Sequence, residues 1–203
     1  MRAVWNLPAA FGRFREMGGV LDFATFDDAE GDEKSALAAI SMIIPDVDQT
    51  KLKLLGFRRI DLGAFYGDWY DADGDALLKF GTITTDDGRK LVNPRLRDLD
   101  RMTVSRAFHI PEAGMGGQFA YAFSEPPYGL QARPSEVQEL FCAIRDFILP
   151  RGSEHEISDW SSPRLTEASD YFTAGMDWWG VFLFTVYLPT LRRLTAIAGS
   201  TTD

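Results

Sequence analysis

The side chains best suited to proton transfer or metal binding are scarce in this sequence, which has two histidines and one cysteine among 203 residues. His109, His155 and Cys142 are widely separated, whereas zinc ligands usually come in closely spaced pairs. The serine nucleophile patterns Gly-x-Ser-x-Gly and Ser-x-x-Lys do not occur. We therefore expect no metal site and no cofactor, and the sequence leans away from an enzyme.

A glycine-rich stretch, GMGGQFA at residues 114–120, has part of a dinucleotide-binding fingerprint. Phe119 stands where that fingerprint needs a third small residue, and we predict a strand there instead of the required helix. The triplet Gly116-Gly117-Gln118 resembles the catalytic tripeptide of peptide-chain release factors over these three residues. Because the chain carries a net charge of −9, it is poorly suited to lie against ribosomal RNA. A hairpin turn is the preferred interpretation.

A second stretch, DADGD at residues 71–75, has part of the spacing of a calcium-binding loop. Its glycine comes two positions early, and Thr82 stands where the bidentate glutamate belongs. We predict a polar turn.

The segment SEPPYGL, residues 124–130, has the composition of a rigid turn, because two prolines fix the backbone and a glycine permits a reversal. Tyr128 would present an aromatic ring with a hydroxyl group on this stiff loop, so binding would cost little entropy. Glu125 beside it could contact a cation. The turn either binds a partner or only carries the chain from strand to helix.

Trp178 and Trp179 begin an apolar run that we predict to be a strand. Adjacent side chains of a strand point to opposite faces, so one indole should enter the core while the other lies near the surface. An exposed tryptophan is a typical energetic hot spot of a protein interface.

Acidic residues are concentrated between positions 22 and 33, a stretch without any basic residue. Four of them, Asp27, Asp28, Glu30 and Asp32, would steer a basic partner, although a merely solvated acidic face is the simpler interpretation.

Our leading hypothesis is thus a protein-binding module with an acidic, aromatic-bearing surface. Its general character, small, acidic and without a catalytic signature, is similar to that of immunity proteins and other inhibitors. The alternative is a small-ligand-binding protein or enzyme with an aromatic-lined pocket on the sheet, whose polar groups would include His109, Tyr121 and Glu125. A homo-oligomer is a third alternative.

Three helices are expected from start and stop signals. EKSALAAISMII predicts a helix from about Asp32 to Ile44, and DQTKLKLLG predicts a second with Asp48 as N-cap and Gly56 after its end. A third, amphipathic helix covers about 135–149, where Ser135 and Gln138 have the spacing of a capping box.

Strands are expected on both sides of the Asp87-Gly88 hairpin turn and in TVSRAFHI, QFAYAFS, RLTEASDYF, WGVFLFTVYL and RRLTAIAGS. TVSRAFHI and QFAYAFS should pair with each other through the glycine-rich stretch 111–117. Helices and strands do not alternate regularly, so we predict an α+β fold with mostly antiparallel sheets, on which the amphipathic helix packs.

The length of 203 residues fits a single domain, with a helical part at 1–56 and a sheet-rich part at 57–203 as possible subregions. The most apolar run, residues 178–188, is too short to span a bilayer, and the N-terminus lacks the apolar core of a signal peptide. With its single cysteine and acidic charge, the chain is expected to be cytoplasmic and to contact neither membrane nor nucleic acid.

Overall fold

A computed structural model describes residues 1–102, 104–105 and 111–201. It confirms the expected α+β fold with antiparallel sheets. The largest sheet has six strands in the order β1-β2-β11-β10-β9-β3. These strands are β1 (Arg2–Ala3), β2 (Asp22–Asp27), β3 (Arg58–Ile60), β9 (Glu156–Asp159), β10 (Val181–Leu188) and β11 (Arg193–Ser200).

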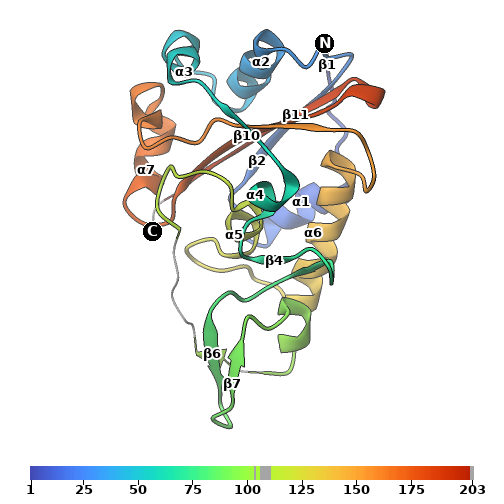
Figure 1. Cartoon of the computed structure of the whole chain (residues 1–203), viewed down its shortest axis with the longest axis vertical. Coiled ribbons are helices and arrows are strands. Elements are labelled where there is room, and N and C mark those ends of the chain that lie inside the picture. Colours follow the sequence, from blue (N-terminus) through green and yellow to red (C-terminus); the bar gives the residue numbers. More distant parts are fainter. Residues whose placement is uncertain (103, 106–110, 202–203) are drawn as a thin grey trace.

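Helices lie on both sides of this sheet, as Figure 1 shows. Those on the described part of the chain are α1 (Ala9–Glu16), α2 (Glu33–Ile43), α3 (Gln49–Leu55), α4 (Leu62–Tyr66), α5 (Phe119–Ser124), α6 (Pro134–Ile148) and α7 (Thr173–Met176). Helix α2 packs on one face of the sheet, whereas α1, α4, α5 and α6 cover the other.

The hairpin of β10 and β11 is the centre of the sheet, and alternate side chains of its strands enter two different apolar clusters. Leu183 and Ala196 contact the helix α2 side, whereas Phe184 and Ile197 contact the side of α5 and α6. A strand whose two faces are both covered is apolar along most of its length, as β10 is at residues 181–188. This run lies at the centre of the six-stranded sheet.

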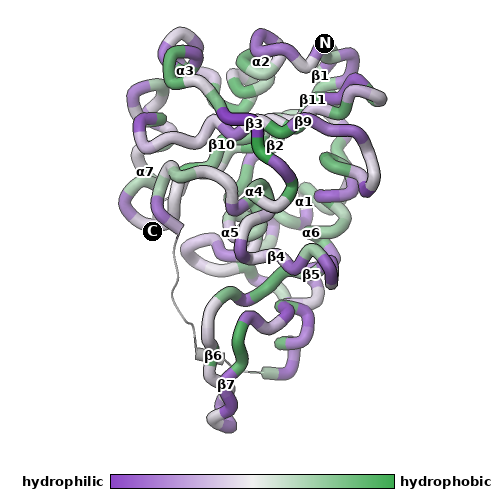
Figure 2. The backbone as a smooth tube through the Cα atoms, in the orientation of Figure 1, coloured by the Kyte–Doolittle hydropathy of each residue, from purple (hydrophilic) through white to green (hydrophobic). Residues whose placement is uncertain are grey.

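Two smaller sheets extend from the main body. The strands β4 (Tyr70–Asp71) and β5 (Ala76–Leu77) form one, and β6 (Thr82–Thr85), β7 (Lys90–Val92) and β8 (Val104–Ser105) form the other. Strands β6 and β7 make the hairpin predicted at Asp87-Gly88, where Gly88 has φ +82°. Figure 2 shows that the tip of this hairpin is hydrophilic.

The predicted helices at Asp32–Ile44, 48–56 and 135–149 are confirmed as α2, α3 and α6. The side chains of Asp32 and Asp48 accept hydrogen bonds from the first-turn amides of α2 and α3, and Gly56 follows α3 with φ 76°. Sequence analysis missed β2, which pairs with β11. The six-stranded sheet therefore contains strands from both expected subregions, residues 1–56 and 57–203.

The prediction of a strand over QFAYAFS is wrong, because residues 119–124 form helix α5. Its first five residues are all buried, with Phe119 stacked on Phe65 and Phe123 stacked on Phe14. A short helix surrounded by protein is apolar on every side, and its sequence cannot be distinguished from a buried strand by periodicity. Strand β8 consequently pairs with β6, and the predicted hairpin through residues 111–117 does not form.

Two further predictions are corrected. The segment RLTEASDYF forms two short 3-10 helices, Leu165–Glu167 and Asp170–Phe172, instead of a strand. The β10 strand begins at Val181, so the two tryptophans lie in the preceding turn.

The capping box predicted at the start of α6 is also wrong. The amide and hydroxyl of Ser135 both donate to the carboxylate of Asp100, at 2.7 and 2.5 Å, while Gln138 turns inward and accepts from the Leu77 amide. A residue 35 positions earlier thus caps the helix. Local spacing cannot reveal such a cap.

No helix within the described ranges is long and apolar enough to cross a membrane.

Candidate functional site

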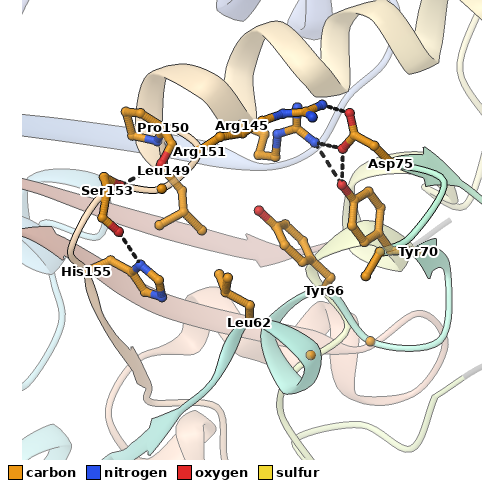
Figure 3. Close-up of a pocket in the computed structure, with 14 residues that line it drawn as sticks. Leu62, Tyr66, Tyr70, Asp75, Arg145, Leu149, Pro150, Arg151, Ser153 and His155 are labelled. Carbon is orange, nitrogen blue, oxygen red and sulfur yellow. Dashed lines mark hydrogen bonds and ion pairs between the residues drawn. The ribbon is translucent and has the colours of Figure 1, made fainter.

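A pocket of about 410 Å³ lies between helix α4, the end of α6 and the loop that follows α6 (Figure 3). We call it the α4–α6 pocket. Its lining residues are Leu62, Gly63, Tyr66, Gly67, Tyr70, Ala72, Asp75, Arg145, Leu149, Pro150, Arg151, Gly152, Ser153 and His155. Most of the apolar lining comes from leucine, tyrosine and proline side chains, and the polar groups come from several separate segments, as is usual for small-molecule sites.

Helix α4 forms one wall of the pocket. The carboxylate of Asp61 caps it by accepting from the Ala64 amide at 2.8 Å, and Gly67 ends it with φ 72°. A Cβ atom at Gly67 would lie 2.1 Å from the Gln118 side chain, so a glycine is required there both for its backbone angle and for space. This sharp end leaves the ring of Tyr66 buried, with its hydroxyl directed toward α6 (Figure 3).

A buried guanidinium group forms the opposite wall. Arg145 of α6 is only 2% exposed, and its Nη1 atom donates to the Tyr70 hydroxyl at 2.8 Å and to Asp75. The Tyr70 hydroxyl donates in turn to the same Asp75 oxygen, and Arg151 binds the other one. Two arginines and a tyrosine thus converge on one carboxylate (Figure 3).

Asp146 compensates the remaining side of the Arg145 guanidinium group. Its carboxylate accepts from Arg145 Nε at 2.9 Å and lies 2.8 Å from Nη2, although this second contact lacks the geometry of a hydrogen bond. Burial lowers the pKa of Arg145, but hydrogen bonding to Asp146 and nearby negative charge outweigh burial and raise it above its ordinary value. Arg145 is therefore a fixed cation within the fold.

Two polar groups of the pocket have unused hydrogen-bonding capacity. The Tyr66 hydroxyl has no hydrogen-bond partner within the described part of the chain, and desolvation by burial raises the pKa of Tyr66 to about 12. It is therefore a protonated donor at neutral pH. His155 Nδ1 lies 2.8 Å from the Ser153 carbonyl oxygen, which can only accept, so Nδ1 carries the proton and Nε2 is left for another contact.

A second, larger groove of about 630 Å³ lies at the β1 edge of the sheet. Trp5 and Met42 contribute exposed apolar surface to it. Its charged lining residues, Arg15 and Asp22, form an exposed ion pair with a separation of 4.0 Å. Because the α4–α6 pocket has a buried charge and two polar groups with unused hydrogen-bonding capacity, it is the better candidate for a specific ligand.

Four residues singled out in the sequence come together elsewhere. The indole Nε1 of Trp179 donates to the Glu125 carbonyl oxygen at 2.8 Å, which joins the tryptophan turn to the SEPPYGL turn. Trp179 is buried, whereas Trp178 and Tyr128 have exposed fractions of 61% and 77%. The expectation of one buried and one exposed tryptophan is thus confirmed. Glu125 forms an ion pair with Lys79, so its carboxylate already has a cation.

The four acidic residues also have partners within the chain. Asp27 pairs with Arg193 at 3.0 Å, Glu30 pairs with Arg192 at 2.7 Å, and Asp32 caps α2. Asp28 lies 3.6 Å from Arg2. The acidic stretch is therefore partly neutralised by arginines that are distant in the sequence.

The acidic and aromatic groups lie at opposite ends of the β10–β11 hairpin. Arg193, the partner of Asp27, begins β11, whereas the tryptophan turn precedes Val181, which pairs with Ser200 at the far end. Eight paired residues at about 3.3 Å each separate the two ends by roughly 25 Å. A single small contact cannot include both groups.

The alternative pocket expected from the sequence has a different setting. Tyr121 is buried and its hydroxyl donates to the Trp179 carbonyl oxygen at 3.3 Å, while Glu125 is occupied by Lys79. His109 lies outside the described residues. None of the pockets described above is lined by Tyr121 or Glu125.

The two motif-like stretches form turns that are held by hydrogen bonds within the chain. Gly116, Gly117 and Gln118 all have φ between 65° and 81°, and the Gly117 amide donates to the buried carboxylate of Asp159 at 3.0 Å. The turn predicted at 71–75 is confirmed, because Asp71 accepts from the Gly74 amide at 2.9 Å. The described residues contain no cluster of three or more histidine, cysteine or acidic side chains that could hold a metal ion.

Sequence analysis missed the α4–α6 pocket, although one signal for it was present. Arg145 follows Phe141 by four positions and Val137 by eight, so it lies on the apolar stripe of its helix. A charge at such a position needs a buried partner.

Comparison with known proteins gives no relative. No protein-family model matches the chain, and no significant match was found among curated proteins or solved structures.

Proposed function

We propose that the protein binds a small organic molecule in the α4–α6 pocket. The observation that carries this proposal is the unused Tyr66 hydroxyl in a pocket of about 410 Å³ whose opposite wall contains a buried, fixed cation. Apolar surface from Leu62 and Leu149 would exclude water from the ligand, and the polar groups would orient it. The pocket geometry favours a small-ligand-binding protein over a protein-binding module, which was the leading hypothesis from the sequence.

A substitution that fills the pocket provides the test. Leu62 lies at the start of α4 with an exposed fraction of 37%, so Leu62→Trp adds volume at the pocket without disturbing the core. Leu54→Trp is the matched control, because Leu54 lies on α3 with an exposed fraction of 81% and does not line the pocket. A fragment library would be screened by ligand-observed fluorine NMR against all three proteins.

We expect the wild type and Leu54→Trp to bind the same fragments, and Leu62→Trp to lose them, with affinity reduced at least tenfold. Similar melting temperatures of the three proteins would show that the variants fold. Fragments that bind equally well to Leu62→Trp, or a screen without saturable binding, would contradict the proposal.

A second function is favoured by the contact between the tryptophan and SEPPYGL turns. Because Trp179 Nε1 holds the two turns together, Tyr128 and Trp178 are exposed on adjoining segments that are already ordered. We propose this pair, the aromatic surface, as a contact for another protein. The acidic residues would add long-range attraction for a basic partner from the far end of the hairpin. A cytoplasmic location belongs to the same proposal.

Replacement of both exposed rings tests the aromatic surface. We expect the double variant Tyr128→Ala, Trp178→Ala to lose a stoichiometric partner captured from the native host's extract, since truncation of each hot-spot ring typically costs about 2 kcal/mol or more. The double variant Trp5→Ala, Leu54→Ala removes exposed apolar side chains elsewhere and should retain that partner. Equal capture by both variants would rule out the aromatic surface as the contact.

A further inference from the structure

The charges that line the α4–α6 pocket are unlike those of the whole chain. Two arginines and one aspartate line it, whereas the chain has a net charge of −9. Asp146 pairs with Arg145 from outside the lining, so the four charges of this cluster cancel. The selectivity of the pocket therefore depends on which of its charged groups a ligand can reach.

Both oxygens of the pocket aspartate already have donors within the chain. One Asp75 oxygen accepts from Tyr70 and Arg145, and the other accepts from Arg151. A ligand ammonium group would have to compete with Arg151 for the second of these oxygens. In the free protein the carboxylate therefore positions the two arginines.

The cationic groups differ in their freedom to move. Arg145 is fixed by Tyr70, Asp75 and Asp146 and is buried. Arg151 lies in the loop after α6, its side chain is 66% exposed, and Asp75 is its ion-pair partner. When Arg151 moves away, Asp75 still keeps the hydrogen bonds from Arg145 and Tyr70. Arg151 can therefore turn from Asp75 to a ligand without leaving a buried charge unpaired.

Two polar groups of the pocket, Tyr66 and His155, have unused hydrogen-bonding capacity, and the first is a donor. The Tyr66 hydroxyl is protonated at neutral pH and can donate to an acceptor of the ligand. A carboxylate or phosphate group has several acceptor oxygens and forms short, strong hydrogen bonds with guanidinium and hydroxyl donors.

We propose that the ligand is a small organic anion. This inference depends on the proposed pocket function and assigns its chemical class. The carboxylate or phosphate group of the ligand contacts Arg151 and the Tyr66 hydroxyl, and its apolar body lies against Leu62 and Leu149. Arg145 acts as a positioning residue that keeps Asp75 in place.

Four probes of one shape separate this inference from the pocket function. Benzoate and phenyl phosphate carry the two possible anionic groups, benzylamine carries a cation, and benzyl alcohol is neutral. Protein-observed NMR titrations would measure the dissociation constant of each for the wild type and for Leu62→Trp. We expect at least one anion to bind tenfold or more tightly than benzyl alcohol, benzylamine to bind least, and Leu62→Trp to bind none. The preferred anion identifies the head group.

Two substitutions test whether Arg151 and Tyr66 donate hydrogen bonds to the ligand. Because Arg151→Gln removes a charge-assisted hydrogen bond to the ligand, we expect it to weaken binding of the preferred anion at least tenfold. Tyr66→Phe should weaken it several-fold. Arg164→Gln, which removes an equally exposed arginine from an ion pair with Glu167, should leave the affinity unchanged. The Arg151 effect should diminish at high salt, where exposed charges are screened.

The possible failures are distinct. If benzyl alcohol or benzylamine binds best and Leu62→Trp removes that binding, the pocket function stands and the anion inference is overturned. If Arg151→Gln and Arg164→Gln weaken anion binding equally, the effect is one of net charge, and the role of Arg151 is overturned. If no probe binds and the fragment screen is also empty, both proposals fail.

Discussion

A charged side chain at a core position determines the chemistry of the proposed site. Arg145 is buried, and its guanidinium group is compensated by Asp75, Asp146 and the Tyr70 hydroxyl. Removing one partner of a buried charge usually costs more than the pair itself contributes. We therefore regard this cluster as the rigid part of the pocket, and Tyr66 and Arg151 as the parts that a ligand can use.

Two tyrosine hydroxyls, those of Tyr66 and Tyr171, should differ in their contribution to the free energy of unfolding. Tyr66→Phe removes a hydroxyl without a partner in the described chain, so we expect the free energy of unfolding to change by less than about 0.5 kcal/mol. Tyr171→Phe removes the donor to Asp22, at 3.1 Å, and should destabilise by about 1.5–3 kcal/mol. Urea denaturation of both variants measures the difference. A large loss for Tyr66→Phe would show that its hydroxyl has a structural partner.

Among the secondary-structure elements, helix α6 carries Arg145 of the proposed site. A carboxylate that is distant in the sequence caps this helix. Asp100 accepts from the amide and the hydroxyl of Ser135 in the first turn of α6. The side-chain and backbone hydrogen bonds from Ser135 hold the pKa of Asp100 below its ordinary value of 3.8. The stabilisation is therefore present above that value and is lost as the pH falls through the lower pKa of the folded state.

Removal of this cap should show the same pH dependence. At pH 7 we expect Asp100→Ala to lower the melting temperature by about 2–4 °C, as the loss of a helix cap does in a chain of this size. Asp98→Ala is the control, because Asp98 lies two residues earlier, in the short 3-10 helix Leu96–Leu99, and its side chain does not cap α6. The difference between Asp100→Ala and the wild type should shrink below about pH 4. A constant difference from pH 7 to pH 3 would contradict the assignment of the cap.

The elements that could be predicted from the sequence are those with local signals. Helices α2 and α3 have aspartate N-caps next to their first turns, and the β6–β7 hairpin has an Asp-Gly turn. Helix α5 could not be predicted, because five consecutive buried residues follow neither the helical nor the strand period. The aromatic residues were recognised by type, but their convergence depends on one long-range hydrogen bond from Trp179 to Glu125.

At the scale of the whole molecule, charge is organised by long-range pairing more than by sequence blocks. The acidic stretch contacts Arg2, Arg192 and Arg193, and the charged cluster of the pocket arises where Arg145 and Arg151 meet Asp75 and Asp146. Neither arrangement can be read from composition, because each depends on which strands and loops become neighbours. Charge reversal of the acidic residues would also break these ion pairs, so the two uncharged rings of the aromatic surface give the cleaner test.

The most direct test of the central claim is a crystal structure of the protein soaked with the tightest-binding fragment or anion. We predict that the compound occupies the pocket between α4 and the loop at 149–155, with an acceptor atom within hydrogen-bonding distance of the Tyr66 hydroxyl. A compound bound at another surface, with the α4–α6 pocket empty, would contradict the account.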